Sequence, residues 1–211
     1  MSDPLSDSIG TFSDLVAAGT PTPGGGSVAA YSGVLAASLG RMMCSLTLGK
    51  AKYVEVEPRV REIDADLELL SGRLRQLIAE DAASFENVLR AYREPKETDE
   101  QKAERKRLID IATRGAVDVP LQTARTALEV LKRLAELAKI GNPNALPDVT
   151  VGSRLAETAV KGAYYNIGIN LKTLADSAAS STIERETAEL IDETERLTAE
   201  IEAMMLKEMG E

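Results

Sequence analysis

One carboxylate interrupts the apolar side of a long amphipathic segment. Between residues 58 and 93, apolar side chains recur every three or four residues, as on one face of an α-helix. These apolar positions are Val60, Ile63, Leu67, Leu70, Leu74, Leu77, Phe85, Val88 and Tyr92. Asp81 fills the step between Leu77 and Phe85, and burial raises the pKa of a carboxyl group unless partners offset it. Asp81 is therefore a candidate general base and acid, or alternatively a structural aspartate satisfied by an arginine or a helix end.

A Pro-Gly stretch, Thr20-Pro-Thr-Pro-Gly-Gly-Gly-Ser27, precedes a long apolar segment. The prolines disfavour helix at the residues before them, and the glycines allow another group to approach the main chain closely. We expect Ser27 to cap the following helix, whose first turn leaves N–H groups unpaired at the positive end of its dipole. Such a helix end suits an anion. Gly24, Gly25, Gly26 and Ser27 are therefore candidate binding residues, unless the stretch only turns the chain into a buried helix.

A local basic and aromatic cluster follows this helix in an otherwise acidic chain. Lys50 and Lys52 are candidates for binding a carboxylate, and Tyr53 for stacking or hydrogen bonding. The alternative is a solvated turn whose lysines favour the C-terminus of the preceding helix.

Asparagines and one further aspartate form a third group of polar candidates. Asn142, Asn144 and Asp148 lie in an irregular stretch, where Asp148 would either cap the next helix or face a ligand. Asn166 and Asn170 lie one turn apart on a helix face expected to be mainly buried. Buried amides must find partners, either across a helical bundle or on a ligand.

The composition limits the chemistry that these candidates can perform. The chain has 211 residues, a net charge of −9, no His and a single Cys. Nucleic acid and anionic membrane surfaces are unlikely partners on this charge, and the chain lacks the usual zinc ligands, so we expect no metal. Cys44 has no partner within the chain, which favours a reducing, cytoplasmic location.

The candidates must be positioned by helices, because 44% of the residues are hydrophobic but only 3% are aromatic, and strand-like alternation is absent. We expect an all-α, single-domain up-and-down bundle over residues 1–211, with about five long helices after a short N-terminal one. The expected helical ranges are 11–18, 27–48, 58–93, 100–119, 120–140, 148–175 and 180–207. Pro120 would either kink the pair 100–119 and 120–140 or start the second run. A small-residue stripe of Ala29, Gly33 and Ala37 resembles membrane helices, but the run before Arg41 is too short to span a bilayer.

Taken together, these stretches resemble the cyclodeaminase/cyclohydrolase family of folate enzymes. The Pro-Gly stretch resembles the family's opening, and the segment ending in Lys50, Lys52 and Tyr53 resembles the close of its second helix. The three remaining similarities are Asp81-Ala-Ala-Ser-Phe85, the loop Gly141-Asn-Pro-Asn144 with Asp148, and Tyr165-Asn-Ile-Gly-Ile-Asn-Leu171. They cover nearly the whole chain in the family's order. One departure is Pro147, which stands where the family has Ser before its Asp.

The resemblance implies chemistry at the carbon that bridges N5 and N10 of tetrahydrofolate, with no cofactor besides the folate substrate. It also implies a homodimer or higher homo-oligomer with folate bound near a subunit interface. Asp81 would transfer protons, and Asp148 would be a second carboxylate or a pterin contact. The four asparagines would orient the pterin or the bridge, and Lys50, Lys52 and the Gly24–Ser27 main chain would hold the benzoyl or glutamate end.

Two reactions fit this resemblance, and a third reading lies outside it. The run from Lys50 to Glu57 is most similar to the cyclohydrolase branch, which opens N5,N10-methenyltetrahydrofolate with water. The alternative is the cyclodeaminase reaction, which closes N5-formimino to N5,N10-methenyl and releases ammonia. A non-catalytic helical scaffold or folate-binding protein is the alternative from another class.

Overall fold

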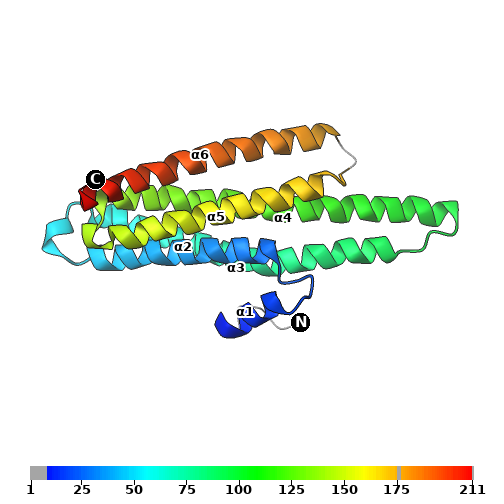
Figure 1. Ribbon diagram of the computed structural model, residues 1–211, viewed down its shortest axis with the longest axis horizontal. Coiled ribbons are helices and arrows are strands. Elements are labelled where there is room, and N and C mark those ends of the chain that lie inside the picture. The colour runs from blue at the N-terminus through cyan, green and yellow to red at the C-terminus, as the bar shows by residue number, and fades with distance from the viewer. Residues whose placement is uncertain (1–8, 175–176, 211) are drawn as a thin grey trace.

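The computed structural model of the protein describes residues 9–174 and 177–210, except for the side chain of residue 177. In these ranges the chain forms α1 (Ile9–Ala17), α2 (Gly25–Thr47), α3 (Glu57–Arg93), α4 (Asp99–Ile140), α5 (Leu146–Leu171) and α6 (Ser177–Met209). Two short 3-10 helices, η1 (Ala51–Tyr53) and η2 (Pro143–Ala145), lie in the connections. Figure 1 shows α2 to α6 side by side, each running opposite to the one before it. The expected all-α bundle of five long helices after a short one is confirmed.

The small residues of α2 allow its neighbours to pack close to its main chain. A Cβ on Gly40 would lie 2.7 Å from a methyl of Leu134 and 2.8 Å from a methyl of Leu67. A Cβ on Gly33 would lie 2.9 Å from Leu74 in the same way. Since α2 contacts α3, α4 and α5, its small-residue surface lies at the centre of the bundle. The structure thus explains the stripe by helix packing, and none of the described helices is long and apolar enough to cross a membrane.

Several helix ends differ from those expected from the sequence. Gly24, not Ser27, is the N-cap of α2, and it makes no side-chain hydrogen bond. Ser27 lies inside the first turn, where its hydroxyl reaches across to α3 instead. Asp148 is likewise not a cap, because α5 begins at Leu146 after the N-cap Ala145. The expected end of α5 at residue 175 lies outside the described residues, and the helix itself ends at Leu171.

Pro120 neither begins a helix nor divides one, since α4 runs without interruption from Asp99 to Ile140. A proline has no N–H, so the carbonyl of Ala116, four residues earlier, loses its helical donor. The side-chain amide of Asn170 on α5 donates a hydrogen bond to this carbonyl at 2.7 Å. This cross-helix bond replaces the missing one and lets α4 continue through the proline.

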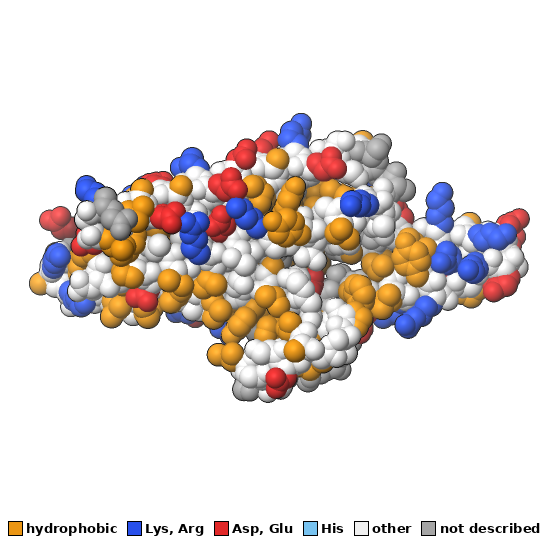
Figure 2. Space-filling model, viewed as in Figure 1, with side chains coloured by type: hydrophobic (Ala, Val, Ile, Leu, Met, Phe, Trp, Pro, Cys, Tyr) orange, Lys and Arg blue, Asp and Glu red, His pale blue; other side chains and the backbone are white. Residues whose placement is uncertain are grey.

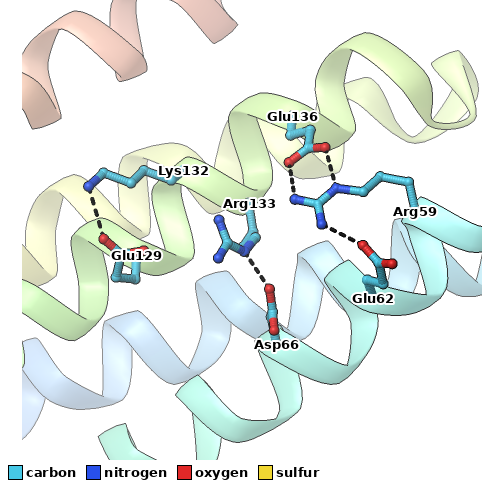
Figure 3. A network of polar contacts seen from close by, with 7 residues as sticks. All are labelled: Arg59, Glu62, Asp66, Glu129, Lys132, Arg133 and Glu136. Atoms are coloured by element: carbon cyan, nitrogen blue, oxygen red, sulfur yellow. Dashed lines mark hydrogen bonds and ion pairs between the residues drawn. The ribbon is translucent and has the colours of Figure 1, made fainter.

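Ion pairs between neighbouring helices fix their alignment at the surface. Arg59 on α3 donates two hydrogen bonds to Glu136 on α4, at 2.6 and 2.8 Å, and Arg133 donates to Asp66 at 2.7 Å (Figure 3). On the other side of α4, Arg125 pairs with a glutamate of α6 at 2.5 and 2.8 Å. The bidentate geometry of the Arg59 and Arg125 pairs gives them directional specificity, although such exposed pairs stabilise a fold only slightly.

α3 and α4 extend well beyond the other helices, as Figure 1 shows. α2 begins at Gly25, and α5 ends at Leu171, which packs against Val117 of α4. Residues 82–93 and 99–115 lie past these points and form a two-helix projection, which we call the arm.

The apolar face of α3 continues into the arm, past the end of the helices that cover it. Leu74 and Leu77 are fully buried, whereas Phe85 and Tyr92 on the same face are 38% and 47% exposed. The sequence pattern predicts this face correctly, but whether it is buried depends on where α2 begins.

α1 lies apart from the bundle (Figure 1). Phe12 is its buried residue and packs against Tyr31 of α2, with ring centroids 5.3 Å apart. Ile9 and Val16 remain exposed.

Candidate functional site

Asp81 lies on α3 against the first turn of α2. Its Oδ2 accepts a hydrogen bond of 2.9 Å from the hydroxyl of Ser27, which also lies 3.4 Å from the carbonyl of Ile78. A Cβ on Gly26 would lie 2.2 Å from Oδ1 of Asp81, so glycine at this position is what lets the carboxylate come so close. The anion at the N-terminus of α2 is therefore the protein's own carboxylate.

The environment of Asp81 raises the pKa of its carboxyl group above the ordinary value for aspartate. Burial is the main cause, and hydrogen bonds from the hydroxyl and the main-chain N–H of Ser27 oppose part of the increase. A helix end therefore satisfies part of the carboxylate's hydrogen bonding, as the structural interpretation expected, yet the pKa of Asp81 stays raised. A raised pKa brings such a group closer to the range useful for proton transfer near neutral pH.

Asn166 on α5 lies on the same side of the bundle as Asp81. A Cβ on Gly25 would lie 3.8 Å from Nδ2 of Asn166, so this amide lies beside the glycine stretch. The amide donates to the carbonyl of Gly162 at 2.8 Å, which leaves its oxygen without a hydrogen bond among the described residues. Gly24, Gly25, Gly26, Ser27, Asp81 and Asn166 thus form one group, which we call the Asp81 group. Asn170 lies one turn further along α5, and its amide donates a hydrogen bond to the carbonyl of Ala116.

The other predicted site residues gather at the opposite end of α2, in what we call the Asn142 group. The Oδ1 of Asn142 accepts hydrogen bonds from the hydroxyl of Tyr53 at 3.3 Å and from the main-chain N–H of Asn144 at 3.2 Å. Its Nδ2 donates to the carbonyl of Leu46 at 3.1 Å. Asn142 is 7% exposed, and these bonds join the end of α2 to η1 and η2.

Polar side chains remain accessible around this structural asparagine. Lys50, Lys52 and Asn144 are exposed, and Asp148 is partly buried in the first turn of α5. The Nζ of Lys52 lies 5.3 Å from the ring centroid of Tyr53. The Asn142 group therefore presents two cations, an amide and a carboxylate to solvent.

The two groups are too far apart to act on one small molecule within a single chain. α2 runs 23 residues from the Asp81 group to the Asn142 group, a length of about 33 Å at 1.5 Å per residue. Asp148 and Asn166 lie 18 positions apart on α5, which corresponds to about 27 Å. Within one chain, the predicted site residues therefore lie in two separate groups.

Clefts on the arm involve neither the Asp81 group nor the Asn142 group. Two clefts on the arm, of about 540 and 670 Å³, are lined by none of the predicted site residues. The described residues hold no cluster of three or more Cys, Asp or Glu side chains able to bind a metal ion. The sequence analysis also missed the pairing of Asn170 with Ala116, for which Pro120 was the available signal.

The fold and the Asp81 group define an all-helical protein with a partly buried carboxylate held at a helix N-terminus. Residues 8–189 match the family described as formiminotransferase-cyclodeaminase. The chain belongs to this family, as the resemblance of its motifs indicated.

Named relatives in the family fall into two kinds. The chain is 39% identical over 198 residues to the methenyltetrahydrofolate cyclohydrolase of Methylorubrum extorquens, with 94% of this chain and 92% of that protein covered. It is 33% identical over 189 residues to the formimidoyltransferase-cyclodeaminase of Sus scrofa, of which it spans 35%. Among solved structures, formiminotetrahydrofolate cyclodeaminase from Thermotoga maritima superposes with a TM-score of 0.87 at 28% identity, covering 96% of this chain and 98% of that one.

Proposed function

We propose that the protein is a methenyltetrahydrofolate cyclohydrolase, which opens N5,N10-methenyltetrahydrofolate with water to N10-formyltetrahydrofolate. The observation that carries this proposal is the 39% identity to a cyclohydrolase that matches this chain nearly end to end. The bifunctional relatives align over about a third of their length, so the comparison with them concerns one part of a larger protein.

Asp81 serves as the general base in this mechanism. The methenyl bridge carries positive charge, which the nearby carboxylate stabilises while it accepts a proton from the attacking water. The new C–O bond forms at the bridging carbon, and the bond from that carbon to N5 then breaks as N5 takes up a proton, which Asp81 can return. The hydroxyl oxygen loses its proton to form the formyl group, so one proton is released overall.

A second copy of the chain completes the site. In an antiparallel dimer, the Asn142 group of one subunit would lie beside the Asp81 group of the other, which removes the separation of about 33 Å. Lys50 and Lys52 would then hold a carboxylate of the substrate from the partner's side, with Asn144 and Asp148 near the pterin or the bridge. Asn166 would contact the substrate from the same side as Asp81.

The outer face of α2 suits such a contact. Val28, Leu35, Met42 and Leu46 are exposed and recur at intervals of seven and four residues, so they share one face along the whole helix. Exposed apolar surface of this extent is typical of an interface between subunits. A two-fold axis perpendicular to α2 would place the start of α2 in one subunit beside the end of α2 in the other. The exposed apolar face and the positions of the Asp81 and Asn142 groups therefore support the same antiparallel dimer.

The test follows methenyltetrahydrofolate by its ultraviolet absorbance with the purified protein, after subtraction of the spontaneous rate. We expect absorbance to fall with the methenyl substrate and not to rise with the N5-formimino compound. Protein carrying Asp81→Asn serves as the control for a contaminating activity. No change with either compound would exclude both reactions and support a non-catalytic binding protein.

The second candidate function is the cyclodeaminase reaction. It is favoured by the similarity of the whole fold to a structure described as formiminotetrahydrofolate cyclodeaminase. In that reaction N10 attacks the formimino carbon, and Asp81 would carry a proton from N10 to the departing ammonia. A rise in methenyl absorbance together with ammonia release would establish it.

A further inference from the structure

We propose that the face of the arm continuing from Asp81 binds the aminobenzoyl-glutamate part of the substrate, an aryl amide that ends in carboxylates. The subsite consists of Phe85, Val88, Tyr92 and Arg105. This proposal rests on the proposed function, because it takes the one-carbon bridge to lie at Asp81.

The aromatic side chains of the subsite share a face of α3 with Asp81. Phe85, Val88 and Tyr92 follow Asp81 by four, seven and eleven residues, which places all three on its side of the helix. α2 begins beside Asp81 and therefore does not cover them, so the rings of Phe85 and Tyr92 stay exposed. Exposed rings in a row offer a surface on which a planar aryl group can stack.

Arg105 lies where this row of side chains ends, in a cleft that Glu94, Glu100 and Glu104 also line. The guanidinium carbon of Arg105, on α4, lies 5.5 Å from the ring centroid of Tyr92, and an N–H of the same group donates to the carbonyl of Tyr92 at 3.1 Å. The Nε of Arg105 is buried with no hydrogen-bond partner. Among the residues that the structure describes, Arg105, Arg93 and Lys106 make no ion pair.

These unpaired cations are notable in a chain with a net charge of −9, where carboxylates are plentiful. Figure 2 shows hydrophobic side chains where the arm leaves the bundle, and both basic and acidic side chains further toward its tip. Carboxylates of a ligand would bond to the other N–H groups of these cations, and charge-assisted hydrogen bonds to arginine are stronger than neutral ones.

The order of chemical groups along the arm follows the order along the substrate. From Asp81 to Tyr92 the distance along α3 is about 16 Å at 1.5 Å per residue. The one-carbon bridge at Asp81 is followed by the aryl ring at Phe85 and Val88. Lys50 and Lys52 of a second copy would hold one carboxylate, and carboxylates further along a polyglutamate tail then reach Arg105. The alternative occupant of this face is a second copy of the chain, which would need an acidic surface at Arg105 and would cover the rings. The experiment below distinguishes a second copy from the substrate.

The experiment measures binding of p-aminobenzoyl-tri-γ-glutamate to the full chain by isothermal titration calorimetry. This probe has no one-carbon bridge, so its binding does not depend on catalysis. We expect Arg105→Ala to raise the Kd about tenfold through loss of a charge-assisted contact. Phe85→Ala should raise it about fivefold through loss of ring stacking.

Two matched variants serve as controls. Arg90→Ala removes a cation nine residues after Asp81, on the opposite side of α3, and Leu69→Ala removes an exposed apolar side chain outside the arm. Both should leave the Kd unchanged. Light scattering after size-exclusion chromatography reports the oligomeric state of every variant.

The outcomes separate this proposal from the proposed function. Cyclohydrolase activity combined with probe binding that neither Arg105→Ala nor Phe85→Ala weakens would overturn the subsite and leave the function intact. A change of oligomeric state in place of affinity would show that a second copy covers this face, and would also overturn it. Binding that both variants weaken, in a protein without activity, would support the subsite and reject the reaction.

Discussion

Asp81 is held in a position that disfavours its charged form. Burial disfavours its charged form, and the donors of Ser27 compensate for part of this effect. Gly26 permits the close approach, because any larger residue would overlap the carboxylate. A residue kept in an unfavourable electrostatic environment by its neighbours is a reasonable candidate for proton transfer.

Replacing Asp81 with Asn should separate its chemical role from its structural one. We expect Asp81→Asn to lower kcat/KM by about 10²–10⁴-fold, the usual contribution of a positioned acid or base. The pKa of Asp81 is raised in the folded state, so its stabilising contribution is present at low pH and is lost as the pH rises through the folded pKa. The variant should therefore be more stable than the wild type to urea at pH 7, and this difference should shrink as the pH falls. A loss of activity below about tenfold would exclude Asp81 as the base.

The hydroxyl of Ser27 should set the pH dependence of the reaction. Its hydrogen bond lowers the pKa of Asp81, so Ser27→Ala should raise that pKa further. Because the base must be ionised, the acidic limb of the profile of kcat/KM against pH should move to higher pH. Ser84→Ala is the matched control, since its hydroxyl bonds to the main-chain carbonyl of Asp81 and not to the carboxylate. Equal profiles for Ser27→Ala and the wild type would contradict this role.

At the scale of elements, α4 is continuous because α5 supplies what Pro120 lacks. We expect Asn170→Ala to reduce the free energy of unfolding by about 1–3 kcal/mol, because the carbonyl of Ala116 loses its donor. Pro120→Ala restores a main-chain N–H at this position, so the same change should cost clearly less in that background. A double-mutant cycle by urea denaturation measures the difference. Additive effects would show that the two residues are not coupled.

The packing of α2 should depend on its glycines more than on its helix propensity. Gly40→Ala places a methyl group against Leu134 and Leu67, and overpacking of this kind costs about 1–3 kcal/mol. Gly72→Ala, within α3, meets no atom within 4 Å and should stabilise by about 0.5–1 kcal/mol. Thermal unfolding of the two variants checks the opposite signs. A stabilising effect at Gly40 would mean that α2 and its neighbours are less closely packed than described.

For the whole molecule, the separation of the two groups makes a prediction about mixed dimers. Asp81→Asn in one chain and Lys50→Ala with Lys52→Ala in the other should each reduce activity. In a mixed dimer, each proposed site takes Asp81 from one chain and the two lysines from the other. One of the two sites therefore carries all three substitutions, and the other site carries none. Random assembly of equal amounts makes half of the dimers mixed, so about a quarter of the wild-type activity should return.

The control for this experiment mixes each variant with itself, subjected to the same unfolding and refolding. Activity that does not recover in the mixed sample would place both groups in one chain's site, or exclude the lysines from it. Recovery would establish that each site takes residues from two subunits.

The sequence alone determined the helices, their order and the residue types available for chemistry. Helical periodicity and Pro and Gly positions are local properties, so the apolar face with Asp81 in it and the five long helices could be predicted. The motif order was also sufficient to indicate the family.

Only the tertiary structure decided which of these residues meet. Ser27 was expected to cap its own helix, but its hydroxyl reaches Asp81, 54 residues away. Asn170 was expected to find a partner across the bundle or on a ligand, and its amide donates to the carbonyl of Ala116 across the bundle. Within one chain, Asp81 and Asp148 belong to groups at opposite ends of α2, so whether they share a site depends on how two chains assemble. Such pairings depend on how helices pack and where each one ends relative to its neighbours, which local spacing in a sequence does not specify.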